Sequence, residues 1–233
     1  MGKPVIVNTH KYGPVVMLTS GCNTALDGKG RVYVLNAMTG ALLQTFVTSA
    51  GAVDTGDAGL AQLAGFTEAD GTGNYPYGGD VLGNLWRFSL EDESVMALAT
   101  LTESAENAQP VTAIPEHATV NGRRMVFVGT ARMLGKTDLG DTKVQSFYAL
   151  WDSNTTITKP LVSLAARTIA VSGSNRSVSG SAIDWTKQQG WYVDFPAGEK
   201  ANTDPSMHIW GSVLHDQQSI SSLLHFNIGP VHG

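Results

Sequence analysis

Short apolar stretches bounded by turn residues recur along the chain. Each stretch is rich in Val, Tyr, Trp or Phe and is flanked by Gly, Asn, Asp or Pro, which is typical of β-strands. The stretches occupy residues 4–8, 13–19, 30–36, 83–89, 124–129 and 146–152. Helical periodicity is confined to residues 58–64 and 93–100, where we expect a helical turn or two. The pattern therefore predicts an all-β protein.

Four aromatic-centred segments resemble one another. Gly30-Arg-Val-Tyr-Val-Leu-Asn-Ala-Met-Thr-Gly40 aligns with the segments that begin at residues 83, 146 and 190. Their central aromatic residues follow one another at intervals of 44 to 62 residues, at Tyr33, Trp86, Tyr148 and Tyr192. One four-stranded propeller blade takes roughly 40–50 residues. The repeat therefore predicts a partial β-propeller of about four four-stranded blades, and we expect residues 1–233 to form a single domain of this type.

The repeat also predicts which side chains make turns and which are buried. Asn36 and Asp152 follow their strands, and their side chains can accept hydrogen bonds from backbone amides further along the turn. Blades stack face to face, so large side chains on the strands are expected in the core. The expected core aromatic residues are Trp86, Phe88, Phe127, Phe147 and Trp151. The Ser- and Gly-rich residues 172–181 are expected to be a surface loop.

Composition and charge indicate a globular chain and argue against a nucleic-acid partner. Of 233 residues, 42% are hydrophobic and 15% are charged, which is enough apolar material for a core. The net charge is −5, so the concentrated positive field that binds phosphates is not expected. We interpret the Arg123-Arg124 pair as solvated loop charge. No run of 18 apolar residues predicts a membrane span, and the N-terminus has no apolar signal core, which leaves the compartment open.

Five motifs, in order along the chain, carry a resemblance to a known family. They are Tyr77-Gly-Gly-Asp-Val-Leu-Gly-Asn-Leu-Trp-Arg-Phe88, Gln109-Pro-Val-Thr-Ala-Ile-Pro115, Val126-Phe-Val-Gly-Thr-Ala-Arg-Met-Leu-Gly135, Gln145-Ser-Phe-Tyr-Ala-Leu-Trp-Asp152 and Gly190-Trp-Tyr-Val-Asp-Phe-Pro196 with Gly198-Glu199. The set resembles the C-terminal domain of the type IV pilus tip-associated adhesin family, the PilY/PilC group. The resemblance covers roughly residues 15–205, and residues 206–233 match the pattern poorly.

This resemblance implies a modified β-propeller at the C-terminal end of a longer, exported protein. The family's propeller is longer than this chain, which resembles its later portion. Members of the family act at the pilus tip and the bacterial cell surface, in association with the outer membrane. The implied functions are pilus assembly, opposition to retraction, and attachment to host cells or other surfaces. The implied partners are pilus components such as minor pilins, together with a host or abiotic surface.

The resemblance also implies a calcium loop directly before the strand that contains Tyr77. Calcium prefers about six to eight oxygen ligands, which such loops supply from alternate positions. In the corresponding residues 66–74, Glu68 falls at the third position, Asp70 at the fifth and Asn74 at the ninth, with Asp80 as a further candidate ligand. Phe66 occupies the first position, where an acidic ligand is needed. The alternatives are a weak calcium site and a metal-free turn, which Phe66 favours, with Asp80 capping the backbone of its own turn.

The chain carries no recognisable catalytic motif, so we expect it not to be an enzyme. Its six His residues have no zinc-binding spacing, and its single Cys22 is expected to be a small buried apolar residue. The main alternative is a propeller enzyme similar to quinoprotein dehydrogenases, whose blade motif resembles residues 30–40. Those enzymes use a vicinal Cys pair or acidic calcium and quinone ligands, and a single Cys excludes the first. A further alternative is a purely structural propeller fragment.

Overall fold

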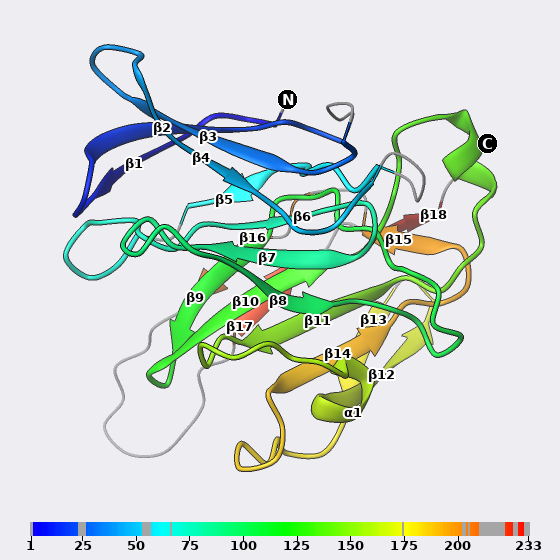
Figure 1. The fold of residues 1–233 in the computed structure, drawn as a ribbon. Helices are drawn as coiled ribbons and strands as arrows, with labels where there is room; N and C mark the ends of the chain where they lie inside the picture. Colours follow the sequence, from blue (N-terminus) through cyan, green and yellow to red (C-terminus); the bar gives the residue numbers. More distant parts are fainter. Residues whose placement is uncertain are drawn as a thin grey trace.

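A computed structural model describes residues 2–22, 27–52, 57–65, 67–173, 175–201, 204, 206–209, 222–225 and 228–230. Three antiparallel four-stranded arrangements stack as successive layers (Figure 1). Blade 1 consists of β1 (Val5–Thr9), β2 (Gly13–Thr19), β3 (Arg31–Asn36) and β4 (Leu42–Val47). Blade 2 consists of β5 (Leu63–Ala64), β6 (Tyr77–Gly79), β7 (Asn84–Phe88) and β8 (Val95–Thr100). Blade 3 consists of β9 (Glu116–Val120), β10 (Arg123–Gly129), β11 (Ser146–Trp151) and β14 (Gly190–Asp194).

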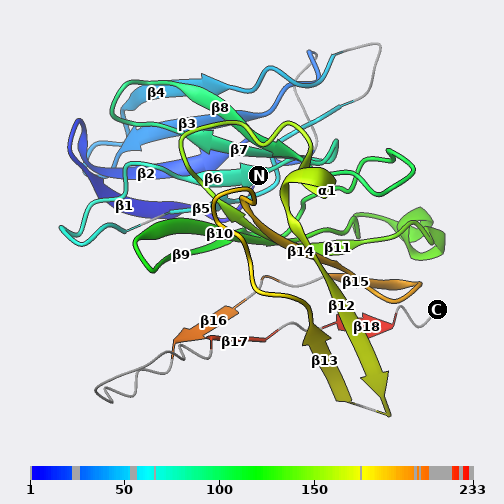
Figure 2. The same cartoon turned by 90° about the horizontal axis from the view of Figure 1, so that it is seen from below.

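The remaining elements lie around blade 3. β12 (Ala165–Ser172) pairs in parallel with β14 and forms a hairpin with β13 (Asn175–Ser179), which projects from the body of the molecule in Figure 2. Two further pairs join β15 (Glu199–Ala201) to β18 (Ile228–Pro230) and β16 (Ser206–Ile209) to β17 (Ser222–His225). The described helical segments are short, the 3-10 helix η1 (Lys136–Gly140) and α1 (Pro160–Ser163). The all-β, partial-propeller prediction is confirmed.

The fourth aromatic-centred segment does not begin a blade of its own. Tyr192 on β14 is the direct cross-strand partner of Tyr148 on β11, and their rings stack with centroids 5.8 Å apart. Both repeat segments therefore belong to blade 3. The residues between them include β12 and β13, so the expectation of a loop over residues 172–181 is wrong where β13 forms.

The expectation of helical turns is also wrong for the second segment. Residues 95–100 form β8, which pairs with β7, and residues 63–64 form β5. Met, Ala and Leu are good helix formers, but propensity is a weak preference that pairing with a neighbouring strand overrides.

The core consists of three apolar layers, two of which lie between blades. Phe46 of blade 1 meets Phe88 of blade 2 with ring centroids 5.8 Å apart, while Leu98 of blade 2 packs in the layer that contains Tyr148 of blade 3. A third layer covers the other face of blade 3 and includes Phe127 and Phe147. Of the expected core aromatic residues, Trp86, Phe88, Phe127 and Phe147 are buried, and Trp151 is half-buried at the margin of the third layer.

Strand β7 is buried on both faces. Successive side chains of a strand point to opposite faces, and Leu85 packs toward blade 3 while Trp86 packs toward blade 1. This explains why the motif reads as a continuous apolar run rather than an alternating one. The turn predictions are also confirmed: Asn36 Oδ1 accepts hydrogen bonds from the amides of Met38 and Thr39, and Asp152 Oδ1 accepts one from the amide of Asn154, each at 2.9 Å.

Candidate functional site

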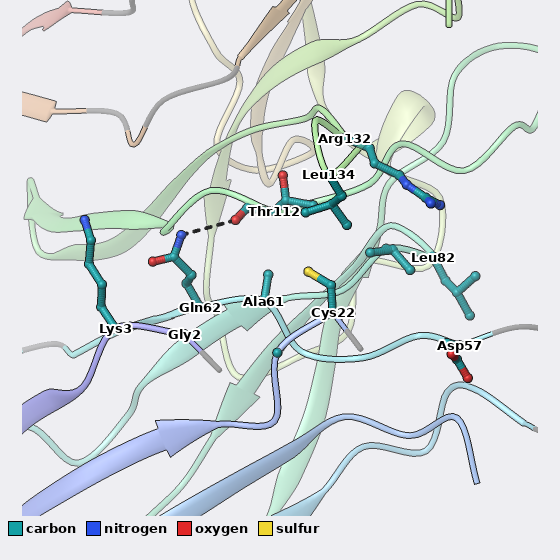
Figure 3. Close-up of a pocket in the computed structure, with 12 residues that line it drawn as sticks. Gly2, Lys3, Cys22, Asp57, Ala61, Gln62, Leu82, Thr112, Arg132 and Leu134 are labelled. Atoms are coloured by element: carbon teal, nitrogen blue, oxygen red, sulfur yellow. Dashed lines mark hydrogen bonds between the residues drawn. The ribbon is translucent and has the colours of Figure 1, made fainter. Parts of the chain in front are cut away.

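A groove crosses all three blades at the same end of their strands. Its volume is about 890 Å³, and each blade lines it with residues just before its first strand and just after its second (Figure 3). Blade 1 contributes Gly2, Lys3, Gly21 and Cys22; blade 2 contributes Asp57, Ala61, Gln62, Val81 and Leu82; blade 3 contributes Thr112, Arg132 and Leu134. Because these positions are equivalent in the three blades, the groove is a property of their stacking.

Main-chain hydrogen bonds join neighbouring blades beside the groove. Gly21 and Leu60 exchange two backbone hydrogen bonds of 2.9 Å, which join blade 1 to blade 2. The amide of Val111 donates to the carbonyl oxygen of Asp80 at 2.9 Å, which joins blade 2 to blade 3. Gly79 lies so close to Val111 that a Cβ there would come within 2.1 Å of its side chain. Only glycine permits this approach, which explains why the motif that begins at Tyr77 has a glycine at position 79.

The centre of the groove is apolar and its margins are charged. Cys22 and Ala61 lie between Lys3 on one side and Arg132 and Asp57 on the other (Figure 3). The Gln62 side chain donates to the carbonyl oxygen of Thr112 at 3.5 Å. Arg132 Nε lies 3.2 Å from Asp138 Oδ1, and Lys3 Nζ lies 3.3 Å from Asp204 Oδ2. An apolar centre with a few polar groups at the rim is suited to binding.

Cys22 is half-buried in this groove rather than fully buried. Burial raises the pKa of its thiol. The thiol is therefore protonated at neutral pH and is a weak nucleophile. Its position makes it a contact residue of the groove.

The candidate calcium ligands form hydrogen bonds and ion pairs with different residues. Asp70 Oδ1 accepts hydrogen bonds from the amide and the hydroxyl of Thr72 at 2.9 and 2.7 Å, and its Oδ2 lies 2.8 Å from His10 Nε2. Asn74 Oδ1 accepts a hydrogen bond from the His10 amide at 3.1 Å. Asp70 and Asn74 therefore meet around His10, a residue that the sequence did not single out.

Glu68 and Asp80 lie apart from that cluster. Glu68 Oε1 is 3.3 Å from Arg124 Nη2. Asp80 is fully buried; its carboxylate accepts hydrogen bonds from the amides of Leu82 and Asn84, from the Asn84 side chain and from Trp86 Nε1 at 2.8–2.9 Å. Burial raises the pKa of Asp80, and these donors oppose the rise. Asp80 thus caps the β6–β7 turn.

These oxygen atoms do not form one coordination shell. Among the residues the structure describes, no group of three or more His, Cys, Asp or Glu side chains is placed to hold a metal ion, and Phe66 lies outside those residues. The side chains present therefore do not fit a calcium ion in this arrangement. No observation tests calcium binding directly, and the metal-free turn, which the sequence favoured over a weak calcium site, stays our prediction.

The Arg123-Arg124 pair is not solvated loop charge, contrary to expectation. The Arg123 guanidinium lies beside the rings of Trp151 and Trp185, 5.1 and 4.7 Å from their centroids. Arg124 lies 4.5 Å above the Tyr75 ring, between Glu68 and Asp152. Arginine stacks on aromatic rings and remains charged when partly buried. The residues that surround Arg123 and Arg124 are distant in sequence, so the Arg123-Arg124 dipeptide alone could not predict this environment.

The stacked blades, with the groove across them, define a segment of a β-propeller. Residues 1–169 match the PilY1 beta-propeller domain, and the chain belongs to this family. It is 35% identical over 164 residues to a type IV pilus biogenesis factor PilY1 homolog of Xylella fastidiosa, covering 67% of this chain and 13% of that protein. It is 27% identical over 246 residues to type IV pilus biogenesis factor PilY1 of Pseudomonas aeruginosa, covering 83% of this chain and 21% of that protein.

The fold is similar to a solved structure. The crystal structure of the Pseudomonas aeruginosa PilY1 C-terminal domain superposes with a TM-score of 0.77 at 24% identity, over 88% of this chain and 53% of that chain. The chain therefore spans about a fifth or less of the full-length relatives and about half of the solved domain. None of the helices in the described part of the chain has the length and apolar character that a membrane span needs.

Proposed function

We propose that this chain is a non-enzymatic module of a type IV pilus biogenesis factor and that it acts by binding other proteins of the pilus. The proposed partners are pilus components such as minor pilins, and the proposed location is exported, at the pilus tip or the outer-membrane surface. The relatives support this, since they carry the name of type IV pilus biogenesis factors. Attachment to host cells or other surfaces is the further role that we propose for the assembled pilus.

The groove across the three blades is the observation that carries this proposal. An apolar centre flanked by Lys3, Arg132 and Asp57 offers contact area and orienting charges together. Residues from three blades line it, so it is present only when the blades are stacked. Such a surface suits a protein segment, whose apolar side chains enter the centre while its polar groups meet the rim.

Two exposed leucines allow a matched test. Leu134 lines the groove, whereas Leu139, five residues further on in η1, does not. Leu134→Glu places a charge in the apolar centre and should weaken binding of purified minor pilins at least tenfold in biolayer interferometry. Leu139→Glu should bind as the unmodified chain does. Equal affinity for all three proteins would refute the groove as the binding surface.

The enzyme alternative has its own test. Pyrroloquinoline quinone is added to the purified chain, and its absorption spectrum is followed. We expect the spectrum to remain that of the free cofactor. A saturable spectral shift would favour a quinoprotein-like enzyme over a pilus-binding module.

A further inference from the structure

The blade 3 side of the groove depends on the connection between β10 and β11. Arg132 and Leu134 of this connection line the groove together with Thr112 (Figure 3). The regular secondary structure in the connection is the short 3-10 helix η1. Connecting segments are the more mobile parts of a fold. The positions of Arg132 and Leu134 therefore depend on tertiary contacts made by the rest of the connection.

The carboxylate of Asp138 holds both groove residues of the connection. Its Oδ2 accepts hydrogen bonds from the amides of Leu134 and Gly135 at 2.8 and 3.0 Å, and its Oδ1 lies 3.2 Å from Arg132 Nε. Burial alone would raise the pKa of Asp138, but the two amides and the charges of Arg132 and Lys200 hold it below its ordinary value. The position of Asp138 thus decides where Arg132 and Leu134 lie.

A buried lysine from outside the three blades contacts Asp138. Lys200 is the middle residue of β15 and is 2% exposed, and its Nζ donates a hydrogen bond of 2.6 Å to the carbonyl oxygen of Asp138. β15 packs against the start of the same connection: the Ala201 amide donates to the carbonyl oxygen of Thr130 at 3.4 Å, and a Cβ at Gly129 would come within 2.3 Å of the Ala201 side chain. Both ribbon views place β15 beside the connection (Figures 1 and 2).

The physical chemistry of Lys200 indicates a role in conformation rather than in stability. Transfer of an ammonium group out of water costs free energy, and lysine is rarely buried without a partner. Apolar residues of similar volume often replace buried charged groups without loss of stability. The Asp138 carbonyl oxygen also accepts a hydrogen bond from the Asp141 amide at 3.4 Å, so it keeps a donor without Lys200. What the lysine adds is a fixed contact at one point of the connection.

We propose that Lys200 is a positioning residue of the groove, which fixes Asp138 and thereby the places of Arg132 and Leu134. The inference rests on the proposed function of the groove and adds to it a residue that does not line the groove. β15 lies beyond residues 1–169, which match the propeller family. The chain that follows blade 3 therefore helps to form a site that the three blades line.

Lys200→Met tests this role, because it keeps a long side chain and removes the charge and the donor. The melting temperature should stay within about 4 °C of that of the unmodified chain. Hydrogen exchange at the amides of Leu134 and Gly135 should become about tenfold faster. The affinity for purified minor pilins should fall about fivefold, because a mobile connection must be ordered on binding. A lower melting temperature with faster exchange throughout blade 3 would show a merely structural role and would overturn the proposal.

Two further variants control for charge and for misfolding. Lys187→Met removes a lysine whose side chain is 80% exposed and does not line the groove, so exchange and affinity should remain unchanged. Asp138→Asn keeps the carbonyl oxygen that Lys200 contacts and removes the carboxylate. It should accelerate exchange at Leu134 and Gly135 and weaken binding. Unchanged exchange in this variant would overturn the proposal even where Lys200→Met does not fold.

The two proposals about the groove can fail separately. An unmodified chain that does not bind minor pilins would refute the proposed function and the effect of Lys200 on affinity. The exchange measurement would still decide whether Lys200 fixes the connection. Unchanged exchange at Leu134 and Gly135 in Lys200→Met would overturn the role of Lys200 whatever the chain binds. Faster exchange with undiminished affinity would overturn it as well, because binding would then not need the connection to be fixed.

Discussion

The phenolic oxygen of Tyr77 donates a hydrogen bond of 2.6 Å to Asp152 Oδ2 and thereby joins blade 2 to blade 3. The same carboxylate lies 3.1 Å from Arg87 Nη1 and 3.7 Å from Arg124 Nη1. Burial, the nearby Asp152 charge and this hydrogen bond raise the pKa of Tyr77, so its hydroxyl stays protonated as a donor. Asp152 is thus the shared acceptor of a buried polar cluster between two blades.

Asp152→Ala should lower the free energy of unfolding by about 3–5 kcal/mol, because it leaves two arginines beside an apolar layer without their shared anion. Tyr77→Phe removes one donor and should cost about 1–3 kcal/mol. Urea denaturation followed by fluorescence measures both. A loss below about 1 kcal/mol for Asp152→Ala would mean that the arginines find other partners.

Trp86→Ala should cost about 3–5 kcal/mol, because it opens a cavity between blades 1 and 2. It also removes one of the donors to the buried carboxylate of Asp80. Trp86→Phe retains most of the apolar volume and should cost about 1–3 kcal/mol, mainly from the lost hydrogen bond. Urea unfolding separates the two contributions. Two equal values would show that the indole ring contributes little by packing.

His10 should make the thermal stability depend on pH. Hydrogen bonds to Glu91 and Asp70 raise the pKa of His10 above its ordinary value of 6.5. A group whose pKa is higher in the folded state stabilises that state below its unfolded pKa, and this contribution is lost as the pH rises through the folded pKa. The melting temperature should therefore fall as the pH rises above 6.5, and His10→Gln should flatten that part of the profile.

Asp70 should make the thermal stability depend on pH in the acidic range. Hydrogen bonds from Thr72 and His10 lower the pKa of Asp70 to about 2. Its contribution is present above the unfolded pKa and is lost as the pH falls toward 2. Since His10 and Asp70 are both exposed, the changes should be small and weaker at high salt. If the unmodified chain and His10→Gln showed the same dependence of melting temperature on pH across neutral pH, the His10 prediction would be wrong.

Calcium and a chelator should leave the melting curve unchanged, because Asp70 and Asn74 are engaged by Thr72 and His10 and Glu68 faces Arg124. Differential scanning fluorimetry with calcium or with a chelator tests this. Any ligand of the native state raises the melting temperature through linkage. A rise with calcium that Asp70→Ala abolishes would instead establish the calcium site.

The strands and their stacking could be predicted because apolar runs bounded by turn residues are local. The number of blades could not, because the interval between Tyr148 and Tyr192 contains β12 and β13. These strands add to the edge of blade 3, so a spacing typical of a new blade arises from an insertion. Pairing of β12 with β14 depends on contacts that no local pattern encodes.

The groove and the polar cluster were harder to predict than the strands. Lining residues such as Cys22, Ala61 and Leu134 belong to no motif that marks a binding site. They form a groove only because the three blades stack with these strand ends side by side. The environment of Arg124 likewise depends on Tyr75 and Asp152, which belong to other parts of the chain. The Asp80 cap was foreseeable because its donors are within six residues.

Strand β7 has a consequence for how the molecule can come apart. Leu85 packs against blade 3 and Trp86 packs against blade 1, so unfolding of blade 2 would expose both apolar layers at once. Melting should therefore proceed in a single cooperative step for the three blades. A protease that cuts between them should release no folded fragment, as expected if the three blades form one folding unit.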